Sequence, residues 1–564
     1  MLTLSSEKSL ARFIAFGSAL TTVLVIWGSV TDPVNSPKLF ILGSFAFAAG
    51  AIAFVLGSKE LWRSSRLWLI GSIVFIVFSI SAIVNSASPL EQNIYGTYGR
   101  NTGFVTYLAL LLISTAATLL RQKSNFNLIL YALFAAGVAN VAYCLWAIAF
   151  GDFIGWNNPY GNILGTFGNP NFIGAFLGIF ITALTAYVVQ PGISWIYRGL
   201  SLVIVAIGLF EIDKSNAVQG LVVSAAGFSI IGFYLVRSRI KSNLILAGYT
   251  IVIAILGFIA LLGALQKGPL TSLIYKTSVS LRGEYWQAGW NMASQSPFTG
   301  IGMDSYGDWY RRARDEQALI LPGPETVTNA AHNIPFDILA YGGWPLFITY
   351  IFLIALATIA IIKVTLRNKN YDGTFITLVV AWACYQIQSV ISISQIGLAI
   401  WGWVLTGAII AYEIATRGSS TSARATASKS KKAKEQILSA TAIGGLGLVV
   451  GALIVVPPLS ADMKWRSALS TNDLTQLKLA LEPSYMTPTD SNRLLNAISI
   501  LENSKLPDVA YEYAKKAVEF NPESFDSWRT LYAVTNSTPA DKELALSNMK
   551  RLDPKNSNPL NTPK

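Results

Sequence analysis

The chain has 564 residues, of which 52% are hydrophobic and only 13% are charged. Its mean hydropathy of +0.48 excludes an ordinary soluble protein, because no soluble domain of this length needs so much apolar surface. The net charge of +12 does not indicate nucleic-acid binding, because residues 460–564 are charge-balanced and the whole excess lies in the apolar part. We therefore expect a protein embedded in a lipid bilayer, with no nucleic-acid partner.

Hydrophobic windows predict an all-α polytopic membrane protein with about thirteen transmembrane helices, since each span takes about 20 apolar residues. A large polar loop at 266–333 and a soluble C-terminal part interrupt this pattern. The expected spans lie near 11–31, 37–57, 67–85, 103–120, 126–150, 170–190, 197–211, 216–236, 244–265, 334–362, 373–391, 396–414 and 437–459.

The basic residues of the membrane part alternate between its two sides. With the N-terminus placed in the cytoplasm, the inner segments hold twenty Lys and Arg, and the short outer loops hold only Lys38, Arg100 and Lys214. This bias follows the positive-inside rule and predicts a multi-pass protein of the cytoplasmic (inner) membrane. The odd number of spans places the C-terminal domain outside the cytoplasm, on the same side as loop 266–333.

Two outer loops contain polar residues that are candidates for a functional role. The stretch from Tyr95 to Gly103 contains Tyr98 and Arg100, and its glycines predict a tight turn at the membrane interface. Arg100 either has a functional role or only extends its charge to the interface from a helix end. In the next loop, Asn169 and Asn171 either cap a helix or face sugar hydroxyls.

The large loop contains a predicted amphipathic helix along the membrane surface, on which Arg282 and Trp286 recur at helical spacing. A Gly300-Ile-Gly302 turn is expected to end it. Arg311 and Arg314 follow in a basic cluster that we expect to be more exposed than Arg282. The alternative is that the tryptophans form an interface belt and the arginines contact lipid headgroups.

The loop ends at Ala331-His332-Asn333, and His332 is the only histidine in the chain. Histidine is the side chain most suited to proton transfer near neutral pH, so we predict a chemical role for it. The alternative is a residue that flanks a helix and makes one satisfied hydrogen bond.

Four stretches, in this order, resemble the O-antigen ligase and O-antigen polymerase superfamily of membrane glycosyltransferases, over about residues 80–410. They are Tyr-Gly-Arg100; Gly168-Asn-Pro-Asn-Phe; Arg282 with its Trp followed by Pro297 to Gly302; and His332-Asn333 followed by Gly342-Gly343. The family's usual Ser-Arg pair after the seventh span is replaced by Ser215-Asn216-Ala217, which leaves the subgroup open.

The resemblance implies an enzyme, without metal or other cofactor, that transfers glycan from a polyprenyl-diphosphate carrier to a glycan, lipid or protein acceptor. Arginine pairs well with phosphate oxygens, so Arg100 and Arg282 would hold the diphosphate and His332 would accept the proton of the attacking hydroxyl. The further substrate-binding candidates are Tyr98, Asn169, Asn171, Trp286, Arg311, Arg314 and Asn333.

Two other functions are considered. A polysaccharide polymerase would belong to the same superfamily. A transporter or flippase of lipid-linked sugars is disfavoured, because transporters tend to carry charged or broken helices at mid-membrane. Here nearly every ionisable residue lies at the end of a predicted span or in a loop.

The chain changes character after the ligase-like part, which we place at 1–417. Residues 418–436 form a basic cytoplasmic linker, 437–459 an additional span, and 460–564 an extracytoplasmic helical domain. Phe520-Asn-Pro522 and Leu552-Asp-Pro554 recur 32 positions apart. This spacing resembles tetratricopeptide repeats, which usually bind protein, so we expect a possible protein partner through 460–564.

Overall fold

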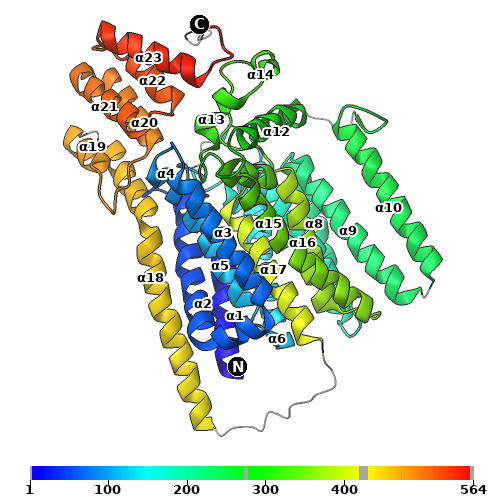
Figure 1. Ribbon diagram of the computed structural model, residues 1–564. Helices are drawn as coiled ribbons and strands as arrows, with labels where there is room; N and C mark the ends of the chain where they lie inside the picture. The colour runs from blue at the N-terminus through cyan, green and yellow to red at the C-terminus, as the bar shows by residue number, and fades with distance from the viewer. Residues whose placement is uncertain are drawn as a thin grey trace.

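The computed structural model describes residues 3–155, 158–159, 161–240, 242–271, 277–417, 430–471, 473–558 and 560. Within these ranges the chain forms helices and no strand, as Figure 1 shows. The predicted all-α polytopic fold class is therefore confirmed. Most of the predicted linker, at 418–429, lies outside the described residues, and its remaining seven positions belong to a helix.

Eleven helices among the described residues are long and apolar enough to cross a membrane. The two other expected spans correspond to α1 (Leu4–Val23) and to α5 (Phe104–Ala117), which has only 14 residues. The eleven are α2 (Asn35–Ser64), α3 (Arg66–Val84), α6 (Lys123–Phe150), α7 (Pro170–Val188), α8 (Trp195–Lys214), α9 (Val218–Arg239), α10 (Asn243–Ala264), α15 (Ile334–Arg367), α16 (Gly373–Val390), α17 (Ile396–Ala415) and α18 (Ser430–Thr471).

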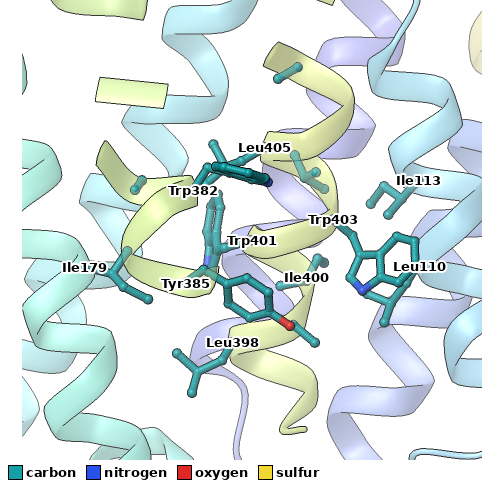
Figure 2. Packing of buried hydrophobic residues seen from close by; sticks show 14 of the residues in the cluster. Leu110, Ile113, Ile179, Trp382, Tyr385, Leu398, Ile400, Trp401, Trp403 and Leu405 are labelled. Atoms are coloured by element: carbon teal, nitrogen blue, oxygen red, sulfur yellow. The ribbon is translucent and has the colours of Figure 1, made fainter. Parts of the chain in front are cut away.

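The centre of the bundle is formed by α7, α16 and α17, whose apolar windows are largely buried within the protein. Figure 2 shows the aromatic side chains of α17 and α16 packed together there, with α5 and α7 contributing aliphatic residues. Helix α10 is the opposite case, because none of its apolar window is buried, and it stands at the edge of the bundle beside α9 (Figure 1).

Helix α18 packs along α2 through glycines. A Cβ atom added at Gly447 would lie 2.6 Å from the carbonyl oxygen of Phe47, and one added at Gly451 would lie 2.7 Å from that of Gly43. Small residues spaced four apart allow helix backbones to approach this closely in a membrane. The predicted domain boundary at 459/460 falls inside α18, which continues to Thr471 and contributes Trp465 to the core of the C-terminal domain.

The C-terminal domain has a hydrophobic core of its own, distinct from that of the bundle. Its helices are α19 (Leu474–Leu481), α20 (Ser491–Asn503), α21 (Pro507–Phe520), α22 (Phe525–Ala533) and α23 (Pro539–Leu552). The domain lies at the same end of the bundle as loop 266–333, and the N-terminus and the start of α18 lie at the other end (Figure 1). This arrangement agrees with the expectation that the domain and the loop share one side.

Candidate active site

The site is built at the end of the bundle from three segments that are far apart in sequence. They are loop 96–103, between α4 (Leu90–Tyr95) and α5; helix α12 (Thr277–Gln295); and residues 329–333, which lead into α15. Each brings one of the three predicted catalytic residues, Arg100, Arg282 and His332, and the charges of both arginines act on the imidazole.

Loop 96–103 is held in place by Asp304, which is fully buried and was not predicted as a site residue. Its carboxylate accepts hydrogen bonds from the Thr97 backbone N–H at 2.8 Å and the Thr102 hydroxyl at 3.1 Å. Burial raises the pKa of Asp304, and the nearby charge of Arg100 opposes that rise. Arg100 itself donates from Nη2 to the side-chain oxygen of Asn329. The Asp304 carboxylate thereby fixes the loop that carries Arg100.

The turn from Pro297 to Gly302 packs against a break in α15. Gly342 and Gly343 have non-helical backbone angles, and the freed groups pair with the turn: Gly302 N–H donates to the Tyr341 carbonyl at 3.0 Å. A Cβ atom at Gly300 would lie 2.3 Å from the same Tyr341 oxygen, so this close approach requires glycine. Two of the sequence stretches that carried the family resemblance are therefore one structural unit.

His332 lies in the short loop before α15 with a φ of +55°, a left-handed conformation that is uncommon for residues with a side chain. Two contacts hold this loop. The Asp337 carboxylate accepts from the Ala331 backbone N–H at 2.6 Å, and the Asn333 side chain caps α15 by accepting from the Phe336 N–H at 3.1 Å. The imidazole packs against the ring of Tyr285, with ring centroids 5.5 Å apart.

The electrostatic setting makes His332 a neutral imidazole. Burial and, to a smaller extent, the positive charges of Arg100 and Arg282 together lower its pKa to about 3. Among the described residues, neither arginine has a carboxylate within ion-pair distance. The site thus holds two arginines without a direct ion pair beside a neutral imidazole, and the buried Asp304 and Asp337 carboxylates interact with the charge of Arg100 only at longer range.

Trp286, one turn along α12 from Arg282, stacks on Phe336 with the ring planes 5° apart and the centroids separated by 6.0 Å. Its indole N–H is buried without a hydrogen-bond partner. A buried donor without a partner is rare in native proteins. Trp286 stays a candidate for substrate binding.

The structure gives three of the other predicted substrate-binding side chains, those of Asn333, Asn169 and Tyr98, structural contacts. Asn333 caps α15, and Asn169 caps α7 by accepting from the backbone N–H of Asn171 at 2.9 Å; the Asn171 side chain is exposed. The Tyr98 hydroxyl donates to Asp462 of α18 at 2.7 Å and so ties loop 96–103 to that helix. For Asn169 the helix-capping alternative fits the geometry, and Asn333 has the same capping role although the sequence analysis did not consider it.

The expected exposure of the second basic cluster is wrong. Arg311 and Arg314, on and just after α13 (Tyr306–Ala313), have side chains only 4% and 0% exposed. Arg314 pairs with Asp553 of the C-terminal domain at 2.6 Å, and Arg311 lies 3.6 Å from the same carboxylate. These arginines bind the C-terminal domain to the loop.

Sequence reasoning missed Asp304, Asp337 and Tyr285. Tyr285 lies between Arg282 and Trp286, and Asp337 lies five residues after His332. Asp304 directly follows the Gly-Ile-Gly-Met stretch. A carboxylate next to a glycine-rich turn in an otherwise apolar region could have indicated a buried acceptor of backbone hydrogen bonds. Within the described residues, no group of three or more His, Cys, Asp or Glu side chains could hold a metal ion.

The fold and the site define a multi-pass helical membrane protein in which two arginines without a direct ion pair among the described residues lie beside a neutral histidine at one end of the bundle. Residues 200–351 match the family model of the O-antigen ligase domain. The resemblance predicted from the sequence is therefore confirmed for residues 200–351, which are similar to the O-antigen ligase domain. The match includes Arg282 and His332 but not Arg100 or the C-terminal domain, whose tetratricopeptide-like character stays a prediction. No curated protein matches the chain.

Proposed function

We propose that this membrane protein is a metal-independent glycosyltransferase that moves glycan from a polyprenyl-diphosphate carrier to an acceptor on the outer side of the cytoplasmic membrane, as an O-antigen ligase does. The observation that carries this proposal is the pair Arg100 and Arg282, whose charges act on a neutral His332 and which form no ion pair with a carboxylate among the residues that the structure describes. Arginines left without a counter-ion fit a substrate that brings its own negative charge, such as a diphosphate.

In the proposed reaction the acceptor hydroxyl attacks the anomeric carbon of the first sugar of the donor. A new glycosidic C–O bond forms as the bond to the diphosphate oxygen breaks, and polyprenyl diphosphate leaves with the electron pair. Arg100 and Arg282 stabilise the negative charge that develops on this leaving group. His332 accepts the proton that the acceptor hydroxyl loses.

Binding of the donor would also raise the pKa of His332. In the unliganded site the two arginine charges depress the pKa of His332, in addition to the effect of burial. A bound diphosphate would compensate those charges, so the pKa would rise and proton transfer to the imidazole would become more favourable. The base would therefore be strongest when the donor is in place.

The direct test reconstitutes the purified protein in vesicles with a polyprenyl-diphosphate-linked glycan and a hydroxyl-bearing acceptor. Free polyprenyl diphosphate and glycosylated acceptor should appear in equal amounts. Donor that crosses the bilayer without cleavage would instead show a transporter and contradict the proposal. The product also separates the two transfer reactions, because a ligase attaches preformed chains once and a polymerase yields a ladder of increasing length.

The proposed orientation has its own test. A reporter fused after Lys564 should be active only outside the cytoplasm, and one inserted near Lys431, at the start of α18, only inside. Activity of both reporters on the same side would contradict the crossing of the membrane by α18 and place the C-terminal domain in the cytoplasm.

A further inference from the structure

The apolar stretch of α18 has two different faces. The face toward α2 carries Gly447 and Gly451, through which the two helices approach each other closely. Leu446, Val450 and Leu453 recur at helical spacing on the other side, and their side chains are exposed. Because α18 stands at the edge of the bundle (Figure 1), this exposed apolar side contacts lipid where the helix crosses the membrane. It is the lipid-facing side of α18.

Between α19 and α20 the C-terminal domain forms a tight turn at residues 484–487. Ser484 and Thr487 exchange two backbone hydrogen bonds, of 3.1 and 3.0 Å, which places Tyr485 and Met486 at the tip of the turn. Both tip side chains are exposed, Tyr485 at 62% and Met486 at 38%. Single exposed apolar side chains are common on soluble domains, so the meaning of this tip depends on where it lies relative to the membrane helix.

Two side-chain hydrogen bonds place the turn against the lipid-facing side of α18. The Tyr485 hydroxyl donates to the backbone carbonyl of Leu453 at 2.5 Å, and Lys464 Nζ donates to the Thr487 hydroxyl at 2.7 Å. Leu453 and Lys464 are eleven residues apart, which is about three helical turns, so both lie on the same side of the helix. The turn therefore runs along the side that faces lipid.

The depth of the Tyr485 hydroxyl follows from the position of its acceptor. No charged residue occurs in α18 between Ser439 and Ala461, and Leu453 lies about 12 Å along the helix from Ala461. Pro457 has no N–H, so the Leu453 carbonyl lacks its normal helical donor. Within the hydrocarbon of a bilayer, water cannot replace that donor. The Tyr485 hydroxyl replaces it, and so the side chain reaches into the apolar zone of the helix.

From this placement we infer that turn 484–487 is a membrane anchor of the C-terminal domain, whose tip residues Tyr485 and Met486 insert into the bilayer leaflet on the side of that domain. Tyrosine suits this position because its ring is apolar and its hydroxyl is polar. Methionine adds a flexible apolar side chain. Lys464 keeps its ammonium group at the level of the headgroups. The inference requires that α18 crosses the membrane, and it does not depend on the transferase reaction.

The anchor would fix the C-terminal domain at a set height above the bilayer. Arg311 and Arg314 already hold the domain from the large loop through Asp553. Pro488, directly after the turn, lines a small hollow together with Tyr95, the last residue of α4. The anchored turn is thus a neighbour of the loop that carries Arg100, and the bilayer and the large loop together hold the domain beside the candidate active site.

The test measures the depth of the tip in phosphatidylcholine nanodiscs. The full-length Met486→Cys protein is labelled with the fluorophore NBD, and the wild type, whose Cys144 and Cys384 are buried, should take up no label. Lys542→Cys, at an exposed lysine of the same domain, is the matched control. NBD at position 486 should be quenched by nitroxide-labelled phospholipid and should be at least fivefold less sensitive to iodide than NBD at position 542.

Two results would overturn the anchor. Equal quenching by iodide at the two positions would place the tip in water. Protection from iodide without quenching by the nitroxide lipid would show that a protein surface, such as a second copy of this chain, covers the tip instead of the bilayer.

A second measurement leaves the turn unchanged. In nanodiscs of the Lys542→Met variant, hydroxyl-radical oxidation of Met486 and of the introduced methionine is compared by mass spectrometry in the same molecule. Met486 should be oxidised at least fivefold more slowly, and equal rates would contradict the anchor. Neither measurement involves turnover, so an inactive protein with an inserted tip would contradict only the proposed function, and an active protein with a tip in water only the anchor.

Discussion

Two groups of arginines at the same end of the bundle differ in their counter-ions. Arg311 and Arg314 are buried, and both lie within ion-pair distance of Asp553. Arg100 and Arg282 lie beside His332, and among the described residues no carboxylate pairs with them. The two groups look alike in sequence, because all four arginines lie on the predicted outer side, where the positive-inside rule disfavours them.

The difference shows how a structural role can be distinguished from a substrate-binding role for a basic residue at a membrane surface. A buried charge that the protein has already neutralised serves the fold, because removing either partner leaves an uncompensated ion. A partly buried charge without a partner is available for an external anion. Arg311 and Arg314 thus hold the C-terminal domain through Asp553, and we propose that Arg100 and Arg282 bind the substrate.

The largest effect is expected at His332. His332→Ala should lower turnover by roughly 10²–10⁴-fold, as expected for the loss of a general base, while donor binding by the arginines survives. The measurement is the rate of polyprenyl-diphosphate release together with the donor dissociation constant. Normal turnover in a correctly inserted variant would remove His332 from the mechanism.

Asp553→Asn tests the docking arginines. Breaking a buried ion pair leaves Arg311 and Arg314 without their shared counter-ion and should cost about 3–5 kcal/mol of stability. Thermal unfolding and limited proteolysis of the C-terminal domain report this loss. Glu512→Gln is the matched control, because that carboxylate of the same domain is 55% exposed and its pair with Lys516 contributes about 0.2–1 kcal/mol. Equal stability of the two variants would argue against the assigned docking role.

Arg282→Lys tests whether the guanidinium group of Arg282 binds two phosphate oxygens at once. Lysine keeps the charge but cannot bind two phosphate oxygens side by side, so catalytic efficiency should fall about 10- to 100-fold with no loss of stability. If Arg282 only contacted lipid headgroups, kcat/KM of the lysine variant would equal that of the wild type.

The smallest effect is expected at Lys555, which pairs with Asp315 at 2.8 Å in the same interface as Asp553. Both side chains are more than one-third exposed, so Lys555→Ala should change stability by about 0.2–1 kcal/mol and leave turnover unchanged. A large loss of stability would mean that the solvent exposure of an ion pair does not determine how much it stabilises this interface.

The sequence predicts the membrane class well, because apolar windows and alternating positive charge act locally along the chain. It also points to Arg100, Arg282 and His332, since an outer arginine or a single histidine is conspicuous in an apolar chain. It could not separate the two arginine groups, because Asp553 lies about 240 positions from its partners. The buried supports Asp304 and Asp337 were missed for the same reason: their hydrogen bonds depend on how the loop folds back on the bundle.

The pH behaviour of His332 follows from its surroundings. Its folded-state pKa of about 3 is below the usual 6.5, so the folded protein binds fewer protons than the unfolded chain between these values. The contribution of His332 to stability is therefore complete above about pH 6.5 and is lost progressively as the pH falls toward 3. Because His332 is the only histidine, its ring can be followed alone in the full-length protein.

The most direct test of the central claim is NMR of the protein labelled with ¹⁵N-histidine, titrated from pH 8 to 4 with and without polyprenyl diphosphate. The account predicts a single imidazole that stays neutral at pH 5 in the free protein, with a pKa that rises when the diphosphate binds and compensates Arg100 and Arg282. An imidazole that titrates near pH 6.5 and does not respond to polyprenyl diphosphate would contradict the assignment of this site.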